Sequence, residues 1–253
     1  MPFRLVIALL LLLPLLAAAA CARPWRVPFE DWRPYAFIDD QGRHTGLETE
    51  LLAAIAKEMG CSVEYLPDVP RNRRMPMLVA GDLDLLVAAS YDSPNPPESI
   101  WFTRPYRNEE FGAFTRADAG LAPGLQTLRE VLGAGLRLLA HRGPAVVPIV
   151  DEFAAVSRLT AFEDYAKGLQ LLALGRGDVL IGDRLAVLFA ARGAQLGVRE
   201  LALPVRRDVV GYKLSRRRFD AADVARFNEV ILRLEAQGEL RRIRARWLPA
   251  GSR

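Results

Sequence analysis

Several residues able to bind a polar molecule come directly after apolar segments that are expected to form strands. Carboxylates can pair with an ammonium group, arginines with a carboxylate, and tryptophan can stack on a flat or cationic ligand. In α/β proteins, ligands bind beyond the carboxyl ends of the strands, where these residues are expected. They are Glu30, Asp31 and Trp32 after residues 25–29, Ser90 after 83–89, His141, Arg142 and Gly143 after 136–140, and Asp183 after 178–182.

These residues give little support for covalent catalysis. Glu30, Asp31 and His141 could serve as general acids, but nothing in their spacing requires it. The sequence places no nucleophile or carboxylate partner beside His141. It also contains no metal-ligand cluster and no phosphate-binding glycine loop. We therefore expect a binding site without catalytic residues, cofactor or metal.

Some of these residues have a structural interpretation as well. Asp183 could cap a helix over 184–193, which is compatible with ligand binding, and Trp32 could pack on Pro34. Asp84 and Asp178 occupy matching positions in the two halves of the chain and are expected to be structural. Asp183 is the strongest single candidate for a binding residue.

The elements that must position these residues alternate along the first half of the chain. Apolar spacing predicts a helix over 44–60, and Thr45 and Glu48 have the spacing of a capping box at its start. A shorter helix over 71–81 is weakened by Pro76. Strands are expected over residues 25–29, 61–66 and 83–89, which makes a parallel α/β arrangement.

The second half repeats this pattern. Residues 77–88 align without gaps with residues 171–182, as MLVAGDLDLLVA and LLALGRGDVLIG. Each stretch is an apolar helix end, a glycine, an aspartate and a buried strand. Further expected elements are strands over 136–140, 156–161 and 178–182, and helices over 162–175 and 184–193. Two similar α/β halves predict a protein with a cleft between them.

The first 20 residues are typical of a secretory signal, because Arg4 is their only charge and an apolar run follows it. Cleavage is expected after Ala20 or Ala22. Cys21 is an alternative lipidation site, although the usual leucine three residues earlier is an alanine. The only other cysteine, Cys61, could form a disulfide with Cys21 or remain a buried thiol.

Composition and charge are those of an ordinary globular protein: 253 residues, 51% hydrophobic, 25% charged, and a net charge of +4. The basic run RRIRARW near the end suggests a nucleic-acid patch. However, Leu240, Ile243 and Trp247 lie at helical spacing, which makes the arginines the solvated face of an amphipathic helix. No nucleic-acid motif accompanies them, so we expect no nucleic-acid partner.

Several motifs in order resemble the bacterial solute-binding proteins of the polar amino-acid uptake family, extracellular solute-binding protein family 3. The family's signature is matched by GLETELLAAIAKEM at residues 46–59. The resemblance continues in GDLDLLVAA (81–89) and FTRPY (102–106), and it ends in LEAQGELRRIRARWL (234–248), which is similar to the family's closing helix.

This resemblance implies an α/β fold of the type II periplasmic binding protein class. Its two lobes would each hold a small mixed, mainly parallel sheet flanked by helices. Two hinge strands would join them near 109–114 and 209–215. Lobe 1 is then expected to comprise residues 23–108 and 209–253, and lobe 2 residues 109–208.

The resemblance also implies roles for individual residues. Trp32 falls where the family stacks an aromatic ring on the ligand, and Glu30 falls near an acidic pocket residue. Asp183 matches the aspartate that receives the ligand's ammonium group. Gly143 matches a turn whose backbone amides meet the ligand's carboxylate.

At one position the sequence departs from the family. Where α-amino-acid-binding members carry an arginine that grips the ligand's carboxylate, this chain has Pro96. Losing such a contact costs on the order of 1.5–3 kcal/mol. Arg73, Arg104 or Arg142 could supply the charge instead. Gly143 is also followed by Pro144, which removes another donor.

The expected function is therefore that of an exported, periplasmic and monomeric binding protein for a small polar solute, which it passes to an ABC permease or a membrane sensor. Anchoring through a lipidated Cys21 is the alternative location. The alternative functions are an enzyme on the same scaffold, similar to cyclohexadienyl or prephenate dehydratases, and an accessory protein that binds no ligand.

Overall fold

The computed structural model describes residues 21–90, 98–121, 124–142 and 147–247. The expected signal segment, Pro96, Gly143 and Pro144 lie outside these ranges, and Ser90 is described only as a strand residue. Within the described ranges, no helix has the length and apolar character needed to span a bilayer.

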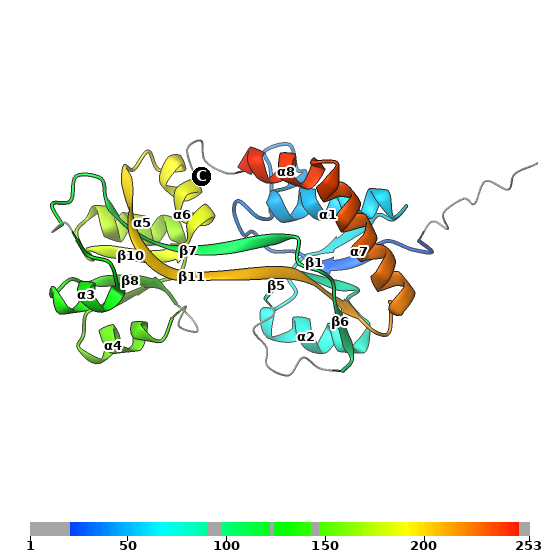
Figure 1. The fold of residues 1–253 in the computed structure, drawn as a ribbon, viewed down its shortest axis with the longest axis horizontal. Coiled ribbons are helices and arrows are strands. Elements are labelled where there is room, and N and C mark those ends of the chain that lie inside the picture. Colours follow the sequence, from blue (N-terminus) through cyan, green and yellow to red (C-terminus); the bar gives the residue numbers. More distant parts are fainter. Residues whose placement is uncertain (1–20, 91–97, 122–123, 143–146, 248–253) are drawn as a thin grey trace, which may run out of the picture.

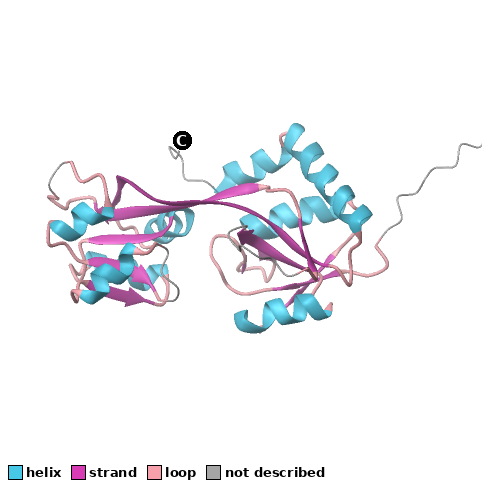
Figure 2. Ribbon diagram, turned by 60° about the horizontal axis from the view of Figure 1, so that its bottom comes forward, coloured by secondary structure: helices cyan, strands magenta, loops and turns pink. Residues whose placement is uncertain are grey.

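Two lobes are joined by two long antiparallel strands, β7 (Arg107–Arg116) and β11 (Val198–Ser215) (Figure 1). Their pairing runs from Val198 opposite Arg116 to Val210 opposite Arg107, with a register shift on the way. The turned view in Figure 2 shows the same two strands passing from one lobe to the other. The hinge ranges implied by the resemblance, 109–114 and 209–215, fall within these two strands, but residues 210–215 of the second pair with strands of lobe 1 rather than crossing between the lobes.

Lobe 1 is built from segments at both ends of the described chain. Strands β1 and β4 pair in parallel as expected, whereas the third expected strand, β5 (Leu85–Ser90), pairs antiparallel with β11. Its core is formed by the apolar faces of helices from both ends, including Leu51, Ile55, Phe227 and Leu240. Its elements are β1 (Trp25–Pro28), β2 (Phe37–Ile38), β3 (His44–Thr45), α1 (Leu47–Glu58), β4 (Val63–Leu66), α2 (Arg71–Ala80), β5 (Leu85–Ser90), β6 (Ile100–Phe102), α7 (Ala221–Ala236) and α8 (Glu239–Trp247).

Lobe 2 is a sheet covered by helices on both faces. Strands β10, β8 and β9 pair in parallel, and β10 pairs antiparallel with β7. Side chains of β10 alternate between two core clusters, Val179 and Ile181 in one and Leu180 in the other, which explains the apolar run at its start. The elements are α3 (Leu128–Gly133), β8 (Leu138–His141), α4 (Ile149–Ala155), β9 (Leu159–Phe162), α5 (Tyr165–Ala173), β10 (Val179–Asp183) and α6 (Arg184–Gly193).

The expected capping box at the start of α1 is wrong. The helix begins at Leu47 after Gly46, and no side chain caps it. Thr45 belongs instead to β3. The side chain of Glu48 is buried and accepts hydrogen bonds from Tyr106 and Arg107, so it cannot reach back to the helix start. Glu48 thus pairs with Tyr106 and Arg107, which are distant in the sequence, instead of with the start of its own helix.

Residues 234–247 near the C-terminus do not form one continuous helix. Helix α7 ends at Ala236 and α8 begins at Glu239, with Gly238 between them at a φ of 74°. That left-handed conformation favours glycine. In α8, Leu240 and Ile243 are buried, which confirms the amphipathic interpretation of the basic run.

The internal repeat is visible in the contacts of Asp84 and Asp178. Asp84 accepts hydrogen bonds from the backbone N–H of Arg26 and from the guanidinium of Arg23. Asp178 accepts them from the backbone N–H and the guanidinium of Arg137. In each lobe, an aspartate thus ties its own strand to the neighbouring one, which confirms the structural role expected for both.

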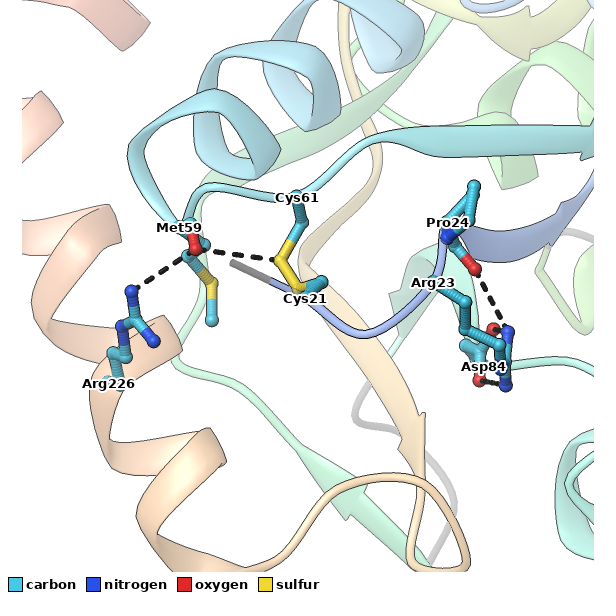
Figure 3. The surroundings of a disulfide bond; sticks show 7 residues. All are labelled: Cys21, Arg23, Pro24, Met59, Cys61, Asp84 and Arg226. Atoms are coloured by element: carbon cyan, nitrogen blue, oxygen red, sulfur yellow. Dashed lines mark hydrogen bonds and ion pairs between the residues drawn. A yellow bond between two sulfur atoms is a disulfide. The ribbon is translucent and has the colours of Figure 1, made fainter. Parts of the chain in front are cut away.

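The segment that follows residue 20 is tied to lobe 1 at two points (Figure 3). Cys21 forms a disulfide with Cys61, just beyond the end of α1. Arg23 pairs with Asp84 at 2.7 Å. Of the two fates that the sequence left open for Cys61, the structure has the disulfide.

Candidate functional site

Asp183 lies at the end of β10, where the chain turns into α6 and faces lobe 1. Its carboxylate accepts a hydrogen bond from the backbone N–H of Ala186 at 2.7 Å, so it caps the helix. The residue is only 4% exposed. Burial raises the pKa of Asp183, although the N–H of Ala186, the hydroxyl of Tyr35 and the charge of Arg107 oppose the shift.

Tyr35 of lobe 1 reaches Asp183 across the junction of the lobes. Its hydroxyl lies 2.8 and 2.7 Å from the two carboxylate oxygens and donates to this carboxylate. Burial is the main reason why the pKa of Tyr35 lies well above its usual value. On the lobe 2 side, the backbone N–H of Asp183 donates to the hydroxyl of Tyr165 at 2.8 Å. Asp183 is therefore held by both lobes.

Trp32 lies beside this contact. Its ring stacks on that of Tyr35 with centroids 4.2 Å apart, and the indole is only half-buried. The neighbouring Phe37 touches Phe189 of α6, with ring centroids 6.3 Å apart. Trp32 and Asp183 thus belong to one constellation at the junction of the lobes, joined through Tyr35.

A buried ion pair supports the other face of Tyr35. The Arg107 guanidinium lies 4.8 Å from the centre of the Tyr35 ring. It is bonded to the Glu48 carboxylate, and the side chains of Arg107 and Glu48 are 2% and 1% exposed. Tyr106 donates its hydroxyl to the same carboxylate. This cluster fixes the position from which Tyr35 meets Asp183.

Glu109 is a further carboxylate near this cluster, on the hinge strand β7. Burial raises its pKa to about 7; Arg107, 3.5 Å away, opposes this shift, and the charges of Asp183 and Glu48 add to it. Arg107 thus faces more carboxylates than it can neutralise. The surplus of negative charge favours a cationic partner at the junction of the lobes.

We expect Glu109→Gln to remove a pH dependence of stability. The folded pKa lies above the usual 4.5, so the folded state binds more protons than the unfolded state between these values. The free energy of unfolding therefore falls as pH rises from about 4.5 to above 7, by about 1–3 kcal/mol. Urea unfolding at pH 5 to 8 should show the variant gaining stability relative to the parent protein as pH rises. A difference that does not change with pH would contradict this.

Glu30 is already engaged by two arginines of α2. Its carboxylate lies 3.0 Å from Arg71 and 2.9 Å from Arg74. Burial alone would raise the pKa of Glu30, but the hydrogen bonds from Arg74 and Arg71 lower it below its usual value. Arg73, the arginine singled out from the sequence, is exposed on the same helix. The structure therefore places Arg71 and Arg74, and not Arg73, against Glu30.

The predicted residues after β8 are described only in part. Arg142 is exposed and pairs with Glu163 at 2.6 Å. His141 is exposed as well, and its ring contacts those of Phe162 and Tyr165. The roles of Arg142, Ser90 and Gly143 in binding stay predictions. The described residues include no group of metal-binding side chains.

The residues missed by the sequence analysis are Tyr35, Arg107 and Glu109. Tyr35 follows Pro34 and looks like a core aromatic. A signal was nevertheless present, because it lies three residues after Trp32 in the same polar loop. Arg107 and Glu48 are 59 residues apart, and no local pattern links them. Glu109 was assigned only to a hinge crossing.

The family model for bacterial extracellular solute-binding proteins, family 3, matches residues 27–250. A probable amino-acid ABC transporter-binding protein of Haemophilus influenzae is 23% identical over 216 residues, which cover 85% of this chain and 80% of that protein.

Two solved structures have the same fold. A histidine kinase sensor domain with similarity to periplasmic binding proteins is 27% identical, with a TM-score of 0.69 over 90% of this chain and 96% of that one. An ancestral cationic amino acid solute-binding protein is 22% identical, with a TM-score of 0.74 over 89% and 96%. With a family match over nearly the whole described chain, this protein is a member of the bacterial extracellular solute-binding proteins, family 3.

Proposed function

We propose that this protein captures a small solute with an ammonium group, of the amino-acid class, between its lobes and delivers it to an ABC-type permease. The observation that carries the proposal is the buried carboxylate of Asp183 at the junction of the lobes. An ammonium group would compensate the cost of keeping this carboxylate charged away from water. Relatives named as amino-acid-binding proteins support the solute class.

Trp32 and the arginines of α2 would complete the site. The half-buried ring of Trp32, stacked on Tyr35, offers a flat surface to the solute. Glu30, two residues earlier, holds Arg71 and Arg74. Pro96 stands where amino-acid-binding members of the family carry the arginine that binds the solute's carboxylate. We expect Arg71 and Arg74, rather than Arg73, to bind that carboxylate instead.

Closure of one lobe on the other would trap the solute. We assign residues 23–108 and 209–253 to lobe 1 and residues 109–208 to lobe 2, because β7 and β11 cross between the lobes. Bending of these two strands would let Asp183 approach and leave Tyr35. The protein would work as a monomer, because both walls of the site come from one chain.

The disulfide supports export in a soluble form. Lipidation of Cys21 would use the thiol that bonds to Cys61, so we place signal cleavage after Ala20 and the mature protein in the periplasm. Intact mass of the exported protein should match residues 21–253 with both thiols oxidised. A mass increased by acyl chains, or a chain starting at Arg23, would contradict this placement.

A ligand screen tests the proposed function. We expect a free amino acid or related amine to raise the melting temperature, and calorimetry to give a micromolar or tighter dissociation constant, about −8 kcal/mol or better. The panel should include amino acids, polyamines, organic acids and oligopeptides. Failure of every member of this panel to bind would favour an accessory protein without a ligand.

The alternative partner of the solute-loaded protein is a membrane sensor, and the likeness to a histidine kinase sensor domain favours this alternative. The two alternatives differ in whether the closed protein contacts a permease or a sensor. Reconstituted permease should take up the solute only with this protein present. Kinase activation without uptake would support the sensor. An enzyme is not favoured, because the curated relatives are named as binding proteins.

A further inference from the structure

A groove of about 810 Å³ lies between the lobes, next to the constellation around Asp183. Its walls are α7 and α8 of lobe 1, the start of α6 in lobe 2, and the hinge strand β7. Tyr35 and Arg107 line it, but Asp183, Trp32 and Glu30 do not. It therefore needs an explanation separate from the proposed solute site.

The charged groups of the groove are paired with one exception. Arg184 lies 2.9 Å from Glu200, and Arg244 lies 2.6 Å from Glu235. Arg107 is bonded to Glu48 beneath the floor. The remaining guanidinium of the lining, that of Arg104, has no carboxylate partner among the residues that the structure describes.

Arg104 is also held in place at its backbone. It lies between β6 and β7, and its backbone N–H donates to the side chain of Asn228 on α7 at 2.7 Å. Two residues on, the carbonyl of Tyr106 accepts a hydrogen bond from Arg244 at 3.0 Å. These two hydrogen bonds fix the backbone of the segment that carries Arg104 against α7 and α8. Less backbone freedom is therefore lost when a ligand binds the Arg104 guanidinium.

The groove has an apolar surface as well. Leu232 of α7 lines it and is 48% exposed, one of few large apolar side chains so exposed in the described residues. Leu185 of lobe 2 and Ile231 of lobe 1 lie along the same groove. An exposed leucine in the same groove as an unpaired cation gives a surface that an amphiphilic anion can cover.

We propose that this groove is a second binding site, which takes a small organic anion with an apolar body. The anionic group would pair with Arg104, and the apolar body would cover Leu232 and Leu185. Because Leu185 belongs to lobe 2 and the other two residues to lobe 1, the bound molecule would touch both lobes. A pairing of opposite charges and a buried apolar area are its two sources of affinity.

Fluorescence titration with 8-anilinonaphthalene-1-sulfonate, an anion with an aromatic body, tests the proposal on the folded mature protein. We expect saturable binding that Arg104→Gln and Leu232→Gln each weaken at least fivefold. Octanoate should compete, and uncharged octanol should compete far less well. The matched control is Arg129→Gln, because Arg129 is an exposed arginine on α3 whose carboxylate partner within the described part of the chain is Glu152.

Two outcomes would overturn this site. One is a probe affinity that stays the same in Arg104→Gln and Leu232→Gln while melting temperatures confirm that both variants fold. The other is loss of probe binding in Asp183→Asn, because that would place the probe in the solute site. Failure of the proposed amino-acid binding would leave the titration unaffected, so the two proposals can fail separately.

Discussion

Arg107→Met is expected to destabilise the folded protein by about 3–5 kcal/mol, because the substitution leaves the buried Glu48 carboxylate without its cation. The Tyr106 hydroxyl still donates to Glu48, but one neutral hydrogen bond compensates only part of the cost of a buried charge. Urea unfolding at pH 7 measures the loss directly.

The double variant Glu48→Gln with Arg107→Met separates charge from packing. Removing both charges should recover much of the lost stability, because a neutral pair has a far smaller desolvation cost. We expect the double variant to unfold at a higher urea concentration than Arg107→Met alone. If the two losses simply add, the ion pair is not the reason for the destabilisation.

Asp183→Asn is expected to weaken solute binding at least about thirtyfold. The substitution removes the charge that would pair with the solute's ammonium group, and losing one member of such a buried pair costs about 2–5 kcal/mol. Asparagine can still accept the N–H of Ala186, so α6 keeps its cap and the fold should persist. Calorimetry with the solute identified in the screen measures the change.

Tyr35→Phe is the matched control for Asp183→Asn. It removes the hydroxyl that bonds Asp183 but keeps the carboxylate charge and the ring stacked on Trp32. We expect the solute to bind Tyr35→Phe at least as tightly as the parent protein, because the ammonium group no longer competes with the hydroxyl. Equal, large losses in both variants would mean that the bridge between the lobes, rather than the charge, determines affinity.

Much of the fold could be predicted because its signals are local. The buried strand β10, for example, begins with a short apolar run between helical patterns. Asp84 and Asp178 occupy equivalent positions in the two lobes, and each accepts a backbone N–H from the neighbouring segment. The start of α1 could not be predicted in this way. Glu48 has a capping-box spacing, but its partner Arg107 comes from a strand 59 residues away.

The candidate site was predictable only at strand ends. Asp183 could be nominated because it follows an apolar strand and precedes a helix, and the structure buries it at the junction of the lobes. Tyr35 and Glu109 gain their importance from tertiary neighbours. A tyrosine after a proline and a glutamate in a hinge strand are ordinary residues until the lobes come together.

A crystal structure of the mature protein with its solute tests the central claim most directly. We predict density for the solute between the lobes, with its ammonium group within hydrogen-bond distance of Asp183 and its body against Trp32. A solute held by one lobe alone, or bound while Asp183 keeps only its contacts to Tyr35 and Ala186, would contradict this account.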